Sequence, residues 1–134
     1  WNVCAKQGGT ASEALIAFAH EYVSYFLDNN ELFRILMTFM LQAENMNLTD
    51  EQNTQLIHTT NENVHVIAEI LQRGVDSGEF ISGMDVRRMQ YAVWGLLNGV
   101  ISLYIYTGVP ERRGERIFTI VHDSLNALIK GIKY

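Results

Sequence analysis

A glutamate and a histidine three residues apart form the sequence's clearest metal-binding spacing. Glu62 and His65 place a carboxylate and an imidazole on neighbouring turns of one helix face. In di-iron four-helix bundles this Glu-x-x-His motif occurs twice, together with two further glutamates. This sequence has no second copy, so we predict no metal site. The alternative is a helical-bundle metalloprotein or enzyme that uses Glu62, His65 and a carboxylate such as Glu21 or Glu69.

Evidence for other catalytic chemistry is equally limited. His122 and Asp123 are adjacent and of the types that form catalytic pairs, but no activated Ser or Cys nucleophile can be argued beside them. The glycines Gly8 and Gly9 lack the strand-turn-helix context of a phosphate-binding loop. We therefore predict no catalytic residue and no cofactor, and a protein that is not an enzyme.

Composition restricts the possible partners. The 134 residues fit one domain, and 48% hydrophobic with 19% charged residues indicates a globular chain. A formal net charge of -5 argues against a nucleic-acid surface, which needs clustered Lys and Arg. The most apolar stretch, 91–106, is interrupted by Gly, Asn and Ser, so no membrane span is expected. We predict a cytoplasmic protein.

Five amphipathic segments predict an all-α fold with five principal helices. Capping-box spacings begin the first helix at Thr10 and the third after Thr49, and Asn30 is a good N-cap for the second. Gly78 ends the third helix, and Pro110 suits the first turn of the fifth. The expected helices begin near residues 10, 30, 50, 85 and 110. Residues 1–9 are interpreted as a residual linker before a helical domain of residues 10–134.

The fourth predicted helix is apolar on almost every side, and such a helix must be buried on every side. A chain of this size covers one side of it more easily than both, so the sequence predicts a homodimer. Gly95, Gly99 and Ser102 lie close together along this helix, and small residues at this spacing let another helix approach closely. The alternative is that the glycines accommodate a side chain of the same subunit.

Aromatic and methionine side chains fall on the inner faces of the first four helices. Ordinary core packing explains such a set, while the polar residues among it, such as Thr60 and Asn63, favour a ligand cavity. Both interpretations stay open on composition alone.

Two stretches carry a resemblance to a known family. The segment Leu-Gln-Arg-Gly-Val-Asp-Ser-Gly-Glu-Phe at 71–80, the small-residue helix that follows it, and Asn-Asn-Glu-Leu-Phe-Arg at 29–34 resemble the C-terminal regulatory domain of TetR-family transcriptional repressors. The helix-turn-helix domain with which family members begin has no counterpart here. DNA contact is therefore expected only through a domain absent from this chain.

The resemblance implies an effector-binding and dimerisation domain of a repressor. Its last two helices would form an intersubunit four-helix bundle, with an interface that includes Gly95, Gly99, Ser102, Ile120 and Leu128. Its first four helices would enclose a small, mostly apolar effector molecule. The predicted ligand-binding residues are Phe18, Tyr22, Met37, Met40, Thr60, Asn63, Val64, Met89, Val93, Trp94 and Asn98. A helical interaction module without a pocket is the other alternative.

Overall fold

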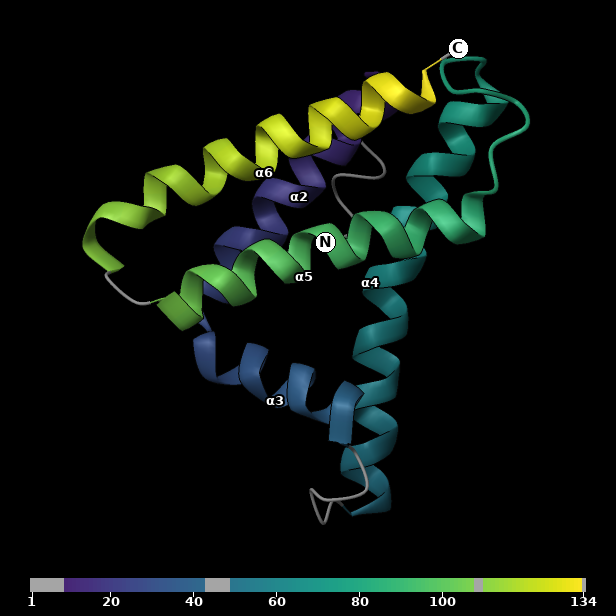
Figure 1. Cartoon of the computed structure of the whole chain (residues 1–134). Helices are drawn as coiled ribbons and strands as arrows, with labels where there is room; N and C mark the ends of the chain where they lie inside the picture. Colours follow the sequence, from purple (N-terminus) through teal and green to yellow (C-terminus); the bar gives the residue numbers. More distant parts are fainter. Residues whose placement is uncertain (1–8, 43–48, 108–109, 134) are drawn as a thin grey trace.

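The computed structural model describes residues 9–42, 49–107 and 110–133, and it confirms an all-α fold of five helices (Figure 1). The helices are α2 (Ala11–Asp28), α3 (Asn30–Gln42), α4 (Asp50–Asp76), α5 (Val86–Thr107) and α6 (Pro110–Ile132). Over these residues no strand forms, apart from an isolated bridge between Phe80 and Lys133. The predicted linker of residues 1–9 lies outside the described residues except for Gly9.

Helix α2 is the central element of the fold, because it contacts each of the other four helices. Its buried residues recur every three or four positions, and Leu15, Phe18, Tyr22, Val23 and Phe26 are each at most 1% exposed. A helix with such a stripe buries it against several neighbours at once. A shift of α2 relative to α3 or α4 would therefore also change its contacts with α5 and α6.

The predicted helix ends are confirmed where they are described. Thr49 and Gln52 form a complete capping box, with two backbone-to-side-chain hydrogen bonds of 3.1 Å. The Thr10 hydroxyl accepts a hydrogen bond from the Glu13 amide and caps α2. Gly78 follows α4 with a φ of 82°, the left-handed conformation that glycine adopts without a Cβ clash.

The connection between α4 and α5 fixes the start of α2. The Glu79 carboxylate accepts hydrogen bonds from the amides of Ala11 and Ser12, at 2.8 and 2.9 Å, and from the Ser12 hydroxyl. A carboxylate at a helix N-terminus is favoured by the unpaired amides and by the helix dipole. The next residue, Phe80, is 1% exposed, so this connection is anchored by both polar and apolar contacts.

Helix α3 connects the end of α2 with the lower part of α4. In Figure 1, α4 descends away from α5, and α3 runs from the end of α2 toward the lower part of α4. Helix α3 therefore contacts both α2 and α4. Over the described residues, none of the helices is both long and apolar enough to cross a membrane.

Candidate functional site

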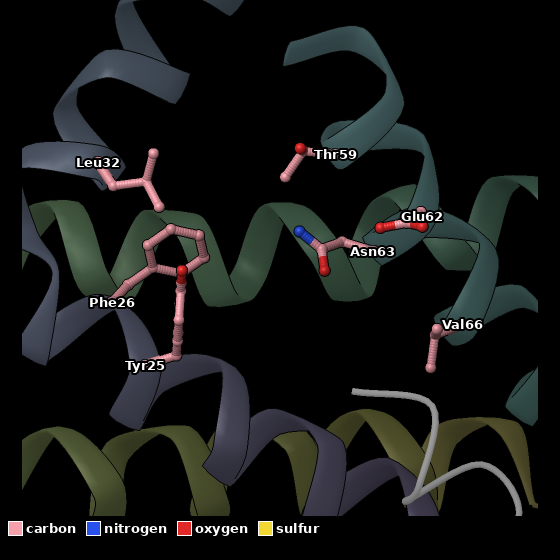
Figure 2. A pocket seen from close by; sticks show the side chains of 7 residues that line it. All are labelled: Tyr25, Phe26, Leu32, Thr59, Glu62, Asn63 and Val66. Carbon is pink, nitrogen blue, oxygen red and sulfur yellow. The ribbon is translucent and has the colours of Figure 1, made fainter. Parts of the chain in front are cut away.

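A pocket of about 250 Å³ lies where α2, α3 and α4 meet. Figure 2 shows its lining residues projecting from the three helices toward a common space. They are Tyr25 and Phe26 of α2, Leu32 of α3, and Thr59, Glu62, Asn63 and Val66 of α4. Apolar walls with a few convergent polar groups are typical of small-molecule sites.

Asn63 is the polar residue most deeply placed in this pocket. Its side chain extends from α4 into the space opposite Phe26 and Leu32 (Figure 2), and the residue is only 6% exposed. Within the described part of the chain, its amide forms no hydrogen bond with another residue. Its amide atoms stay accessible from the pocket, where a ligand with a donor or an acceptor could bond them.

Glu62 is the one residue of the pocket lining that is charged at neutral pH. Its carboxylate lies 3.1 Å from Nε2 of His58, one turn earlier on α4, and its side chain is 65% exposed. His65 has a different partner, Glu69, at 2.9 Å. Glu62 therefore pairs with His58 and His65 pairs with Glu69, so the two residues of the Glu-x-x-His motif have different partners. Among the described residues, no group of three or more metal-ligating side chains converges.

Three of the predicted ligand residues instead meet each other inside the core. The Tyr22 hydroxyl donates a hydrogen bond of 2.5 Å to Oδ1 of Asn98 and accepts one of 3.2 Å from Nε1 of Trp94. Each of the three residues is at most 8% exposed. The cluster joins α2 to α5 and satisfies polar groups that burial would otherwise leave unpaired.

The environment of Tyr22 keeps its hydroxyl protonated. Burial raises the pKa of Tyr22 well above its ordinary value of 10.0, and the hydrogen bonds with Trp94 and Asn98 offset only part of this effect. Tyr22 also packs edge-on against Phe26, with 4.9 Å between ring centroids. Phe26 lines the pocket, so a single aromatic contact connects the pocket with the polar cluster on α5.

The other predicted ligand residues occupy several environments. Phe18 and Val93 are fully buried, while Met37, Thr60, Val64 and Met89 are half-buried. The side chain of Met40 lies outside the described residues. Of the predicted set, Asn63 lines the pocket between α2, α3 and α4. The ligand role of the remaining residues stays a prediction.

The outer side of α5 and α6 carries an unusual set of exposed residues. Gly95 and Gly99 of α5 are exposed, and a Cβ atom added at either would meet no atom within 4 Å. Leu103 of α5 is 66% exposed, and Ile120 of α6 is 50% exposed. Ser102 and Leu128, also predicted at a dimer interface, are half-buried. The glycines therefore do not accommodate a described side chain of their own subunit.

Residues 8–112 match the family described as the tetracyclin repressor-like C-terminal domain. The match spans more than half of the chain, and the chain therefore belongs to this family of TetR-like regulatory domains. Such domains are found in transcriptional regulators, typically bind effectors and dimerise, and generally are not enzymes. No curated protein and no solved structure shows a significant match to the chain.

Sequence reasoning did not anticipate most of the pocket lining. Tyr25 and Thr59 belong to no inward-facing stripe, because the pocket forms at the α2–α3 turn rather than in the centre of the helical core. The sequence indicates Glu62 only as a possible metal ligand. Of the polar residues that the sequence predicts as ligand anchors, Asn63 lines this pocket.

Proposed function

We propose that this chain is the effector-binding and dimerisation domain of a TetR-like transcriptional repressor. In this proposal a small molecule binds in the pocket of α2, α3 and α4, and α5 and α6 pair with the same helices of a second subunit. DNA contact belongs to a domain outside this chain, and the regulator acts in the cytoplasm. The role is sensing rather than catalysis.

The exposed face of α5 is the observation that carries the proposal. Mid-helix glycine costs roughly 1 kcal/mol relative to alanine, so two exposed glycines on one face need a compensating contact. Gly95 and Gly99 lie beside open space, Leu103 one turn after Gly99 is exposed, and Ile120 of α6 is exposed as well. A second copy of α5 and α6 would cover these apolar groups and use the space at the glycines.

Effector binding would act on the dimer through α2. The pocket residue Phe26 packs on Tyr22, and Tyr22 is hydrogen-bonded to Trp94 and Asn98, which flank the glycines on α5. A ligand that moved Phe26 would favour one arrangement of α2 against α5 over another. In a complete regulator this population shift would change the spacing of two DNA-binding domains.

A ligand-induced melting shift tests the proposed pocket. A ligand present at 100 times its dissociation constant stabilises a fold by about 2.7 kcal/mol, so a screen of small amphipathic molecules should detect it. Thr59→Trp places an indole at the pocket mouth and should abolish the shift. Thr54→Trp is the matched control, because the Thr54 and Thr59 hydroxyls both donate to the carbonyl four residues earlier, at 2.9 and 3.0 Å.

The alternatives predict different results from the same samples. A pocketless interaction module would give no shift with any compound. A metalloprotein that uses Glu62 and His65 would carry stoichiometric iron, manganese or zinc after purification. A shift that survives Thr59→Trp and is lost in Met89→Ala would place the ligand among the residues predicted from the sequence.

A further inference from the structure

The pocket of α2, α3 and α4 has a marked charge asymmetry. Glu62 is its one charged lining residue, and no Lys or Arg is among the residues that line it. The last turn of α2, which supplies Tyr25 and Phe26, contains no basic side chain. The partial negative charge at this helix end is therefore not offset by a nearby cation of the same turn.

The beginning of α3 does not reverse this asymmetry. Leu32 reaches the pocket from the first turn of α3, where unpaired amides would favour an anion. Glu31 lies in that same turn and is paired with Arg34 at 3.9 Å, so the side chains at the start of α3 add no net positive charge. The helix ends and the side chains around the pocket thus favour a positive ligand over a negative one.

On the basis of the proposed function, we propose that this pocket binds a compact molecule with an aromatic or aliphatic body and a protonated amine. The body lies against Phe26, Leu32 and Val66. The amine is held by the Glu62 carboxylate and by Oδ1 of Asn63. The three N–H donors of an ammonium group allow it to bond both acceptors.

The apolar part of the pocket fits such a body. Phe26 is 1% exposed and Val66 is 3% exposed, so both present hydrocarbon surfaces that do not move freely. The rings of Tyr25 and Phe26 meet edge-to-face, with centroids 5.2 Å apart and an interplanar angle of 82°. Aromatic faces also attract cations, which adds to the preference for an amine. The volume of about 250 Å³ limits the ligand to a small molecule.

The polar part of the pocket fits an amine for two separate reasons. Asn63 is 6% exposed and directed into the pocket, and its accessible amide can accept a hydrogen bond from a ligand amine. Glu62 is already paired with His58, but both side chains are more than 60% exposed. Exposed ion pairs of this kind are weak, so the ligand amine can replace the imidazole.

Three probes that differ only in the polar group test this inference. They are 2-phenylethylamine, 2-phenylethanol and phenylacetate, titrated calorimetrically against the full chain at low salt. The amine should bind about fivefold more tightly than the alcohol, the upper range for a solvent-exposed ion pair. Phenylacetate should bind more weakly than either.

Two substitutions on α4 separate local from long-range charge effects. Glu62→Gln should remove the preference for the amine and leave the affinity of the alcohol unchanged. Glu69→Gln is the matched control, because Glu69 pairs with His65 as Glu62 pairs with His58 but does not line the pocket. The control should retain the fivefold preference. Asn63→Leu should weaken both the amine and the alcohol.

Several results would overturn the inference. Phenylacetate binding as tightly as the amine, an unchanged preference in Glu62→Gln, an equal loss in Glu69→Gln, or no binding of any of the three probes would each do so. In these cases the proposed function still stands if the broader screen finds a ligand that Thr59→Trp excludes. A screen that finds no ligand at all overturns the proposed function itself.

Discussion

Replacing Tyr22 with phenylalanine removes the hydroxyl that joins α2 to two residues of α5. The ring of Tyr22 is 1% exposed and keeps its packing in the variant. Its hydroxyl bonds Oδ1 of Asn98 and Nε1 of Trp94, at 2.5 and 3.2 Å. Tyr22→Phe therefore leaves an acceptor on Asn98 and a donor on Trp94 buried without their partner.

The size of the effect follows from these two lost bonds. Leaving a buried donor or acceptor unsatisfied costs about 1–3 kcal/mol each. The removed hydroxyl no longer has to be desolvated, which offsets part of this cost. We expect Tyr22→Phe to lower the free energy of unfolding by about 2–3 kcal/mol, more than a typical conservative substitution.

Urea denaturation at one fixed protein concentration measures this loss, because the stability of a dimer depends on concentration. Tyr25→Phe is the control: Tyr25 lies three residues later on the same helix and is 39% exposed, and its variant should stay within about 0.5 kcal/mol of wild type. Adding Asn98→Leu to Tyr22→Phe removes one stranded acceptor, so the double variant should lose less than the two single losses added together. A Tyr22→Phe variant as stable as Tyr25→Phe would refute the reasoning.

Three further predictions concern pH and the α4–α5 connection. Burial raises the pKa of Tyr22, so the protonated hydroxyl stabilises the fold fully below the unfolded pKa near 10, and this stabilisation is lost as pH rises above it. The free energy of unfolding of wild type should therefore fall by up to about 1.4 kcal/mol per pH unit above pH 10, and Tyr22→Phe should lack this pH dependence. For Glu79, partial burial would raise the pKa, but hydrogen bonds from Ser12 and Ala11 and the charge of Lys133 lower it on balance. Glu79→Gln should therefore cost about 1 kcal/mol at neutral pH in thermal melts, and the difference from wild type should vanish as pH falls through the lowered pKa, below 4.5. A Cβ atom at Gly74 would lie 2.2 Å from the Phe80 ring, so Gly74→Ala should cost about 1–3 kcal/mol, whereas Gly83→Ala, which meets nothing within 4 Å, should be nearly neutral in the same melts.

The helices were predictable from the sequence because their boundaries depend on local chemistry. Thr49 and Gln52 are three residues apart, and the capping box they form needs no distant partner. Gly78 likewise ends α4 through its own backbone conformation. Because such capping interactions are local, they do not depend on the tertiary arrangement, and the order and bounds of the five helices were predicted within a few residues.

The pocket was harder to predict because it depends on how three helices cross. Inward spacing correctly indicated that Tyr22, Trp94 and Asn98 are buried, but it does not tell whether buried polar groups face a ligand or each other. Here they satisfy one another. The space that remains open is set by the direction of α3 relative to α4, and no periodicity in either helix encodes that direction.

The proposed function requires that a second copy of the chain covers the α5–α6 face. Light scattering on wild type at micromolar concentration should give twice the 15.3 kDa of one chain. Gly99→Leu should raise the dimer dissociation constant about 5- to 150-fold, since overpacking a close contact costs about 1–3 kcal/mol. Asn61→Leu changes an exposed residue of α4 and is the control, which should remain dimeric. A monomer mass for wild type, or a Gly99→Leu variant that dimerises as wild type does, would contradict the claim.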